Sequence, residues 1–427
     1  MSTAEAKWNL QHWLSVLENR HKVEIHLGLN KISEVAKRMD VLAPACTVIT
    51  VGGTNGKGST VFALEQIYHT AGYKVGTYTS PHLISYNERI RFNLKLIPDE
   101  DLCTAFSIIE TARGSTMLSY FETTTLAALW YFKQQQVDVM LLEVGLGGRL
   151  DATNCIDSNL SIITTIDFDH QEFLGTTLEA IGFEKAGIMR TKVPCIYADT
   201  NPPISIKEQA KIKDVPLYCL QEQYSFIEYN NDWDYQGTSN LKHIPKPRIQ
   251  LKSAAAALTA VDLLQEALPV SESAIKTAMQ QIFVPGRLEF HPGSVNYLFD
   301  VSHNPQSVRL LADYLRQNHS KNRIHAVFSA LKDKDIFGLI MPLKDCVDHW
   351  YPAQLDYKRA ASVDDLISCF KEAEIETNIC YTSPLVAFKT ALEKAEDGDL
   401  IVVYGSFFTV SYVKSAWQHQ LEQKEIQ

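Results

Sequence analysis

The feature that most constrains the fold is an apolar stretch that runs directly into a glycine-rich loop. TVITV (Thr47 to Val51) is rich in β-branched residues, GGTNGKGST follows at 52–60, and the residues after it have helical spacing. Glycines let such a loop turn tightly and point N–H groups at phosphate oxygens, and the helix N-terminus adds a partial positive charge. The order of strand, loop and helix therefore predicts a phosphate-binding loop and a nucleotide site.

Apolar strands and amphipathic helical stretches alternate from Cys46 onward, as in a largely parallel sheet with helices on both faces. The strands we expect are TVITVGG, KVGTYTS, VDVMLLEVG, LSIITTID and VPCIYAD, and the helices span 60–71, 99–112, 123–135 and 177–189. We expect two short helices between residues 8 and 39. The polar segment 221–240 favours hairpins or loops ahead of an alanine-rich helix at 253–268.

A second alternation begins after VPGR at 284–287, with strands expected at NYLFDVS, RIHAVFSA, DHWYPAQ, ETNICYT and DLIVVYG. A chain of 427 residues also exceeds the size at which one hydrophobic core is favourable. We therefore expect an α/β protein with a P-loop NTPase-like parallel-sheet domain over residues 1–286. A smaller Rossmann-like α/β domain should follow over residues 287–427.

Composition argues against several classes of protein. The formal charge of -10 argues against general nucleic-acid binding, which needs a basic surface. No stretch reaches the roughly 18 apolar residues that would span a bilayer, and the start MSTAEAKWNLQHW lacks the order of a signal peptide. The cysteines form no CxxC pair, as expected of reduced thiols. We expect a cytoplasmic protein that binds neither nucleic acid nor membrane.

Polar side chains lie at or near the C-terminal ends of several expected strands, where an open α/β sheet binds its ligands. They are Ser80, Glu143, Asp169 and His170. Oxygen donors with one imidazole suit Mg²⁺ held jointly by protein and phosphates. A lone histidine after a strand is more often structural, but its neighbours here favour a metal site.

Two lysines are candidates for the chemistry. Lys57 in the loop can reach the β- and γ-phosphates, and Ser59 or Thr60 offers a hydroxyl near the metal. Lys185, in GFEKAGIMR, taken alone is a surface lysine with Glu184 as its partner. If Lys185 is instead buried near magnesium, desolvation lowers its pKa and favours the neutral amine, which reacts with CO₂ to give an anionic carbamate.

The loop departs from the common GKS or GKT ending, because Gly58 separates Lys57 from Ser59. GTNGKGS resembles the loop of folylpolyglutamate synthases and, more distantly, of Mur ligases. Other motifs resemble that family in order and spacing: HLGLNKISEVAKRM, SPHLISYNERIRFN, SYFETTTLAALWYF, LEVGLGGRLDATN, DHQEFLG, EKAGI, PGRLEF, FDVSHNPQS and VVYGSFFTV. The resemblance covers most of the chain. It implies a monomeric ligase that uses ATP and Mg²⁺ to join a carboxylate to the amino group of L-glutamate.

The resemblance also implies roles for individual residues. The metal ligands would be Ser80, Glu143 and His170, with Lys185 as a carbamylated lysine. ATP would contact Gly53, Thr54, Asn55, Gly56, Lys57, Gly58, Ser59, Arg287 and Asp300. His303 and Ser406 would be associated with the bound glutamate and with the phosphate side of the site. The catalytic residues would be Lys57, Lys185, Arg287 and His303.

For two of these residues the sequence also allows another interpretation. From the residues alone, Arg287 at the domain boundary can reach phosphates, but a solvated linker arginine explains it equally well. The family usually has an asparagine that contacts adenine at the start of the alanine-rich helix, where Ser253 stands here. A serine hydroxyl can replace part of that bonding, so Ser253 remains a candidate for ATP binding.

The acceptor is also indicated by resemblance. SYFETTTLAALW and LDATN resemble stretches that line a dihydropteroate site in bifunctional members of the family, which implies substrate contacts at Phe121, Glu122, Leu150, Asp151 and Ala152. Core packing is the alternative for Phe121. The expected reaction adds L-glutamate to dihydropteroate and to reduced folates through an acyl phosphate.

Other functions remain open at this point. The chain could be a folylpolyglutamate synthase only, or a Mur-type amino acid ligase, although few residues precede the first strand to form the UDP-binding domain that such a ligase needs. It could also be a P-loop switch ATPase without ligase activity, but that function leaves EKAGI and the motifs of the second domain unexplained. A catalytically dead binding module would be expected to have lost some of these polar positions.

Overall fold

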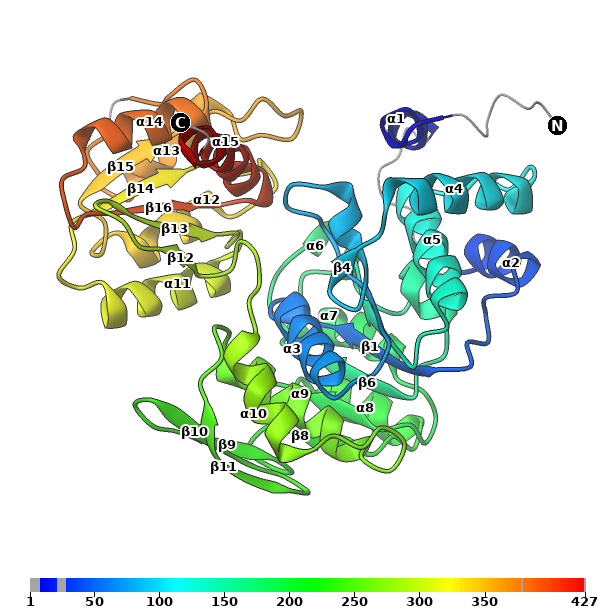
Figure 1. Cartoon of the computed structure of the whole chain (residues 1–427). Helices are drawn as coiled ribbons and strands as arrows, with labels where there is room; N and C mark the ends of the chain where they lie inside the picture. The colour runs from blue at the N-terminus through cyan, green and yellow to red at the C-terminus, as the bar shows by residue number, and fades with distance from the viewer. Residues whose placement is uncertain (1–7, 21–27, 378, 426–427) are drawn as a thin grey trace. The chain divides into compact units, whose positions relative to one another are not determined.

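The computed structural model describes residues 8–20, 28–377 and 379–425, with 419–425 as backbone only. The chain divides into two compact units, Met1–Phe283 and Val284–Gln427 (Figure 1). The sequence placed the division between residues 286 and 287. The first two residues of the motif HLGLNKISEVAKRM lie outside the described residues.

An eight-stranded sheet forms the centre of the first unit, in the order β4-β3-β2-β5-β1-β6-β7-β8. From β2 to β8 neighbouring strands are parallel, whereas β3 and β4 add an antiparallel edge. In sheet order the strands are Lys95–Leu96, Ile90–Phe92, Val75–Tyr78, Val139–Glu143, Thr47–Gly52, Leu160–Ile163, Cys195–Tyr197 and Leu217–Cys219. A three-stranded antiparallel sheet follows, with β9 Ser225–Glu228, β10 Asp232–Gln236 and β11 Asn240–Pro245.

Ten α-helices lie in the described part of the first unit. They are α1 Leu10–Arg20, α2 Asn30–Arg38, α3 Lys57–Thr70, α4 Asp99–Arg113, α5 Tyr120–Gln135, α6 Gln171–Leu174, α7 Leu178–Lys185, α8 Ile204–Ile212, α9 Leu251–Leu263 and α10 Glu272–Gln281. Short 3₁₀ turns occur at η2 Tyr86–Arg89, η3 Ala152–Cys155 and η4 Ala186–Ile188.

The second unit has a five-stranded sheet in the order β12-β13-β16-β14-β15. Its strands are β12 Glu289–His291, β13 Asn296–Asp300, β16 Leu400–Tyr404, β14 Ile324–Phe328 and β15 His349–Pro352. Only β12 is antiparallel. The helices are α11 Pro305–Asn318, α12 Ile336–Ile340, α13 Val363–Glu372, α14 Pro384–Lys394 and α15 Phe407–Glu425, with the turn η5 Met341–Leu343. The two parallel sheets with their helices confirm the expected α/β class.

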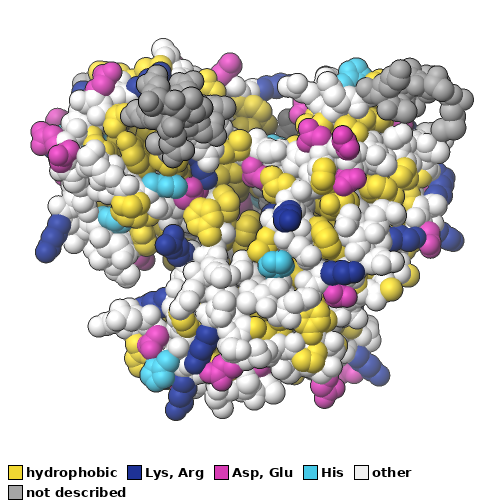
Figure 2. Space-filling view, viewed as in Figure 1, with side chains coloured by type: hydrophobic (Ala, Val, Ile, Leu, Met, Phe, Trp, Pro, Cys, Tyr) yellow, Lys and Arg dark blue, Asp and Glu magenta, His cyan; other side chains and the backbone are white. Residues whose placement is uncertain are grey.

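The surface shown in Figure 2 carries Lys and Arg side chains interspersed with Asp and Glu. Within the described residues, no helix combines the length and the apolar character that crossing a membrane requires.

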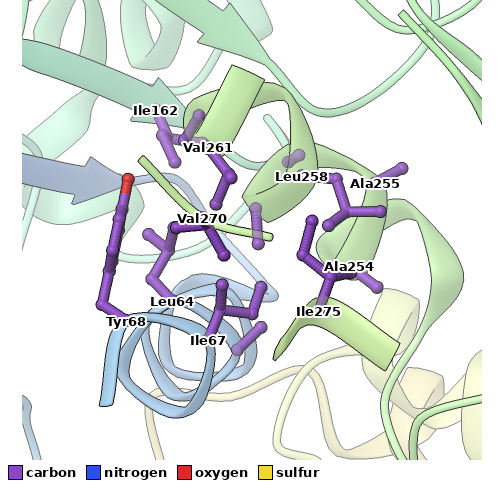
Figure 3. Close-up of a cluster of buried hydrophobic side chains, with 14 of the residues drawn as sticks. Leu64, Ile67, Tyr68, Ile162, Ala254, Ala255, Leu258, Val261, Val270 and Ile275 are labelled. Carbon is purple, nitrogen blue, oxygen red and sulfur yellow. The ribbon is translucent and has the colours of Figure 1, made fainter. Parts of the chain in front are cut away.

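The helix that follows the glycine-rich loop is held by a tightly packed core. Leu64, Ile67 and Tyr68 on α3 are fully buried and face α9 and α10 (Figure 3). The alanine run 254–257 on α9 is also fully buried, and its small side chains let the two helices approach closely. Burying one leucine of this kind contributes about 1.5–3 kcal/mol to the stability of the fold. The packing therefore holds α3 firmly against α9 and α10.

Several elements differ from the sequence expectation for local reasons. Helix α5 begins at Tyr120, earlier than expected, because Ser119 and Glu122 form a capping box. The motif ETNICYT is not a strand: apart from Asn378, which is outside the described residues, it shows only an isolated bridge from Tyr381 to Ala353 beside the edge strand β15. The antiparallel strands β3, β4 and β12 were not expected, since each is too short to show a pattern.

A buried ion pair joins the same helix to the edge of the sheet. The Arg91 guanidinium donates from Nε and Nη2 to the Glu65 carboxylate at 2.7 to 3.1 Å. Its Nη1 donates to the Thr79 hydroxyl at 3.0 Å and to the Glu88 carbonyl at 2.9 Å. The pair therefore fixes α3 against the segment that follows β2.

Replacing Arg91 by methionine should lower the free energy of unfolding by about 3–5 kcal/mol, because the Glu65 charge is left buried without a partner. The matched control is Arg38→Met, which removes an exposed pair with Glu34 and should cost less than about 1 kcal/mol. Chemical denaturation of both variants measures the difference. Equal losses would show that the Arg91 pair is no more important than a surface pair.

Candidate active site

The glycine-rich loop is shaped by the segment that follows β6. Gly53 has φ 138°, and a Cβ there would lie 1.9 Å from Oγ1 of Thr164. The N–H of Thr54 donates to the Thr165 carbonyl at 2.8 Å, and the N–H of Asn55 donates to the Thr165 hydroxyl at 3.0 Å. These two backbone donors are thus used inside the protein. The first turn of α3 presents the N–H groups that a helix leaves without an intrahelical partner, which makes it the natural phosphate contact.

The polar side chains of the loop have distinct surroundings. Lys57 donates from Nζ to the carbonyls of Gly53 and Thr54, both at 3.1 Å, so its ammonium group lies over the loop. Thr60 is fully buried, and its hydroxyl donates to the Gly56 carbonyl at 3.0 Å. Ser59 is half-buried. Which of the two hydroxyls lies near a metal stays a prediction, because a hydroxyl that donates its proton keeps the lone pairs that bind a cation.

Glu143 brings a carboxylate to the start of α3. It ends β5, directly beside β1, and is buried. Its Oε2 accepts the N–H of Ser80 at 3.1 Å. A Cβ on Gly58 would lie 3.8 and 3.9 Å from the two carboxylate oxygens. The fold therefore places Ser80 and the first turn of α3 beside the Glu143 carboxylate, whose oxygens suit a hard cation shared with phosphates.

The position of His170 does not by itself assign it to the same site as Glu143. It precedes α6 in a left-handed conformation with φ 50°, its side chain is about one-third exposed, and its Nε2 lies 3.8 Å from Oδ2 of Asp169. Within the ranges that the structure describes, no group of three or more His, Cys, Asp or Glu side chains is arranged to hold a metal ion. The joint metal site of His170 and Glu143 stays a prediction.

Lys185 is a buried cation at the end of α7. It is only 3% exposed, and burial, assisted by the positive charge of Lys57, lowers its pKa from 10.5 to about 7, against the opposing effects of Asp169 and Asp151. The alternative of a surface lysine paired with Glu184 is wrong: Glu184 pairs instead with Arg149 at 2.9 Å. The condition for a neutral, nucleophilic amine near pH 7 is met.

The first turn of α5 carries two of the expected acceptor contacts. Phe121 is half-buried and packs on the loop after β5, where a Cβ on Gly145 would lie 2.5 Å from its Cζ. Glu122 is buried: its Oε2 accepts the N–H of Ser119 at 2.7 Å, while its Oε1 has no hydrogen-bond partner among the described residues. An unsatisfied buried carboxylate oxygen is costly, so it suits a ligand donor.

Asp151 shapes the neighbouring loop. Its carboxylate accepts the N–H of Leu146 at 2.9 Å, the N–H of Thr153 at 3.0 Å and the Thr153 hydroxyl at 2.7 Å. Burial raises its pKa. Ala152 is buried behind it and Leu150 is half-buried, with its carbonyl bound by the N–H of Gly28. This loop is held rigidly.

In the second unit, Arg287 sits on a constrained turn. Gly286 and Leu288 on either side have φ 69° and 45°. The N–H of Gly286 donates to Glu289 at 2.7 Å, and the N–H of Leu288 donates to Asp300 at 2.8 Å. The Arg287 guanidinium lies 5.7 Å from the ring centre of Phe407. Asp300 and Glu289 therefore hold the turn that carries Arg287, and the role of Glu289 could not be recognised from the sequence.

Two further residues lie at the ends of β13 and β16. His303 packs on the Phe407 ring at 5.9 Å, and its Nδ1 donates to the Val301 carbonyl at 2.9 Å. Ser406 is buried and caps α15, because its oxygen accepts the N–H of Thr409 at 3.0 Å. The structure thus gathers Arg287 and His303 around one ring.

Ser253 lies against the loop from the side of α9. It is buried, and its Oγ is 3.1 Å from the Cβ position of Gly56, whose φ is 87°. Ser253 therefore packs on the loop itself. Thr164 and Thr165, which fix the loop, were missed, because the expected strand LSIITTID ran through both of them, whereas β6 ends at Ile163.

Gly53→Ala should destabilise the protein and remove the rise in melting temperature that ATP produces, because the new methyl group collides with Thr164. Gly72→Ala is the control: φ is 94° there, but nothing lies within 4 Å of its Cβ position, so only about 1–2 kcal/mol of strain is expected. Thermal melts with and without ATP measure both effects. If ATP raises the melting temperature of Gly53→Ala as much as that of the wild type, the close contact between Gly53 and Thr164 is not needed for ATP binding.

Lys185→Met should flatten the pH dependence of stability between about pH 7 and 10.5, since the pKa of Lys185 drops across that range on folding. In this window the unfolded chain binds the additional proton, so the free energy of unfolding rises with pH by up to ~1.4 kcal/mol per pH unit through this group. Denaturation in CO₂-free buffer measures the slope, with exposed Lys211→Met as control. An unchanged slope would mean that Lys185 keeps an ordinary pKa.

Comparisons with known proteins agree with this geometry. The Mur ligase middle domain model matches residues 51–256, and the Mur ligase glutamate ligase domain model matches residues 286–407. The dihydrofolate synthase/folylpolyglutamate synthase of Escherichia coli K12 is 41% identical over 96% of this chain and 96% of its own length.

Solved structures give the same result. Escherichia coli FolC in complex with DHPP and ADP has a TM-score of 0.92 and 40% identity, over 97% of this chain and 99% of that one. A bifunctional folylpolyglutamate synthase/dihydrofolate synthase with Mn, AMPPNP and L-glutamate bound has a TM-score of 0.90 and 38% identity, over 98% of this chain and 100% of that one. The resemblance found in the sequence is confirmed, and the chain belongs to the dihydrofolate synthase/folylpolyglutamate synthase family of ATP-dependent ligases.

Proposed function

We propose that this ligase transfers the γ-phosphoryl group of ATP to a carboxylate of dihydropteroate or of a reduced folate, and then joins the activated acid to the amino group of L-glutamate. The observation that carries the proposal is the Glu143 carboxylate beside Gly58 and Ser80, because it puts a metal-binding group at the start of the phosphate-binding helix. A switch ATPase would need the same loop, but not a second unit that matches a glutamate ligase domain.

Phosphorylation solves the chemical difficulty of the reaction. A carboxylate does not condense with an amine in water because hydroxide is a poor leaving group. In an acyl phosphate the leaving group is phosphate, and the amine attacks the acyl carbon through a tetrahedral intermediate. Lys57 and the first turn of α3 would stabilise charge on the transferring phosphoryl oxygens. Mg²⁺, held by Ser80, Glu143 and His170, would supply further positive charge when bound.

We also propose that Lys185 is carbamylated. Its pKa of about 7 leaves a large neutral fraction at physiological pH. The amine nitrogen would bond to the carbon of CO₂ and lose a proton, which converts a buried cation into an anion. An anionic group near Lys57 and a metal would remove the cost of burying the lysine.

The assignment of substrates rests on the relatives and on side-chain chemistry. A relative is solved with DHPP and ADP, and another with AMPPNP and L-glutamate. Phe121 and the unsatisfied Oε1 of Glu122 suit a flat ring that carries N–H donors. In the second unit, Arg287 and Asp300 would serve ATP, and His303 and Ser406 would serve L-glutamate.

The test is ATP-dependent incorporation of labelled L-glutamate, with dihydropteroate and tetrahydrofolate as parallel acceptors. We expect product from both, and Lys57→Ala should lower kcat by roughly 10²–10³ while the exposed Lys211→Ala leaves it unchanged. Product from tetrahydrofolate alone would reduce the function to folylpolyglutamate synthesis. ATP hydrolysis without product from either acceptor would favour the switch or Mur-type alternatives.

A further inference from the structure

Arg89 is a buried arginine that has no acidic partner among the residues that the structure describes. It ends η2, is 8% exposed, and donates from Nε to Nδ1 of His82 at 2.9 Å. Its guanidinium lies over the rings of Tyr86 and Tyr120, at 5.6 and 5.7 Å from their centres. Among residues 8–20, 28–377 and 379–425, neither of its Nη nitrogens has a hydrogen-bond acceptor and no carboxylate pairs with it. The aromatic faces offset only part of the cost of burying this charge.

Arg91, two residues along the chain, shows how a structural arginine is accommodated here. All three of its side-chain nitrogens donate hydrogen bonds, to Glu65, Thr79 and Glu88. The acid beside Arg89 in the chain, Glu88, is engaged elsewhere. Glu88 accepts the backbone N–H groups of residues 83, 84 and 85 at 2.6 to 2.8 Å, and exposed Glu18 makes no ion pair with Arg89. The two Nη nitrogens of Arg89, which have no acceptor among the described residues, therefore set it apart from Arg91.

The surroundings of Arg89 connect two parts of the proposed active site. Its carbonyl accepts the N–H of Thr79 at 2.9 Å, and the next N–H, that of Ser80, donates to Glu143. On its other side Tyr120 opens α5, whose first turn also carries Phe121. Arg89 therefore lies between the segment proposed for phosphoryl transfer and the segment proposed for the acceptor ring.

We propose that Arg89, oriented by His82, binds a carboxylate of the acid acceptor through its free Nη edge. The inference rests on the proposed function, which requires an acceptor that is both aromatic and anionic. A guanidinium binds a carboxylate through two parallel hydrogen bonds, and the faces of Tyr86 and Tyr120 suit a benzoyl ring beside it. Dihydropteroate offers one carboxylate, and a folate offers those of its glutamyl group.

The direct test is acceptor binding to the full-length protein with ATP analogue present, comparing the wild type with Arg89→Met. We expect the Kd for dihydropteroate to rise at least about tenfold in the variant. The Kd for a dihydropteroate analogue that lacks the carboxylate should change less than about twofold. Arg316→Met, an exposed arginine of the second unit, is the charge-matched control. An equal effect on both compounds, or no effect on either acceptor, would overturn the inference.

Tetrahydrofolate distinguishes which carboxylate is bound. Weaker binding of both acceptors identifies the benzoyl or reacting position, and weaker binding of tetrahydrofolate alone identifies its glutamyl carboxylates. Either result supports recognition of an acceptor carboxylate by Arg89. If the wild type itself binds no dihydropteroate and no tetrahydrofolate, it is the proposed function that fails.

Stability separates this role from a structural one. Arg89→Met removes a poorly compensated buried charge, so its melting temperature should equal or exceed that of the wild type, in contrast to Arg91→Met. Arg89→Lys keeps the charge without the bidentate edge and should bind acceptors with intermediate affinity. A loss of stability in Arg89→Met comparable to that of Arg91→Met would assign Arg89 to the scaffold and contradict the proposal.

Discussion

The site depends on how tightly the segment after β6 confines the loop after β1. Thr164 leaves no room for a side chain at Gly53, and Thr165 takes the backbone donors of Thr54 and Asn55. These contacts hold the residues that lead directly into α3, which begins at Lys57. The core between α3, α9 and α10 holds the remainder of that helix. The positions of Lys57 and Gly58 relative to Glu143 follow from this constraint.

Buried charges in this protein fall into two groups with different consequences. Arg91 with Glu65, and Lys414 with Glu289, are paired and hydrogen-bonded, so they join elements of the fold. Lys185 and Arg89 are buried, and in the described part of the chain neither has a carboxylate at hydrogen-bonding distance; both belong to the first unit near the proposed site. A buried cation without such a partner lowers the stability of the fold. Its presence therefore suggests a role in binding a ligand or in carrying a modification.

The sequence predicted the features that depend on local pattern. The central strands, the loop and the position of Glu143 at a strand end follow from period and composition. The adjacency of Ser80 and Glu143 follows from strand order, which a sequence read alone does not supply. Features that depend on distant partners were missed or wrong: Arg149 takes Glu184 away from Lys185, Glu289 orients the turn of Arg287, and ETNICYT only borders β15. The roles of individual site residues remain proposals.

The proposed reaction requires that phosphate leaves from the acceptor's carboxyl carbon. Dihydropteroate labelled with heavy oxygen in its carboxylate tests this most directly, with mass spectrometry of the inorganic phosphate released during ligation. If the acid is activated as an acyl phosphate, one labelled oxygen moves from the carboxylate to each phosphate formed. Unlabelled phosphate alongside normal product formation would show that the carboxylate never receives the phosphoryl group, which would contradict the account.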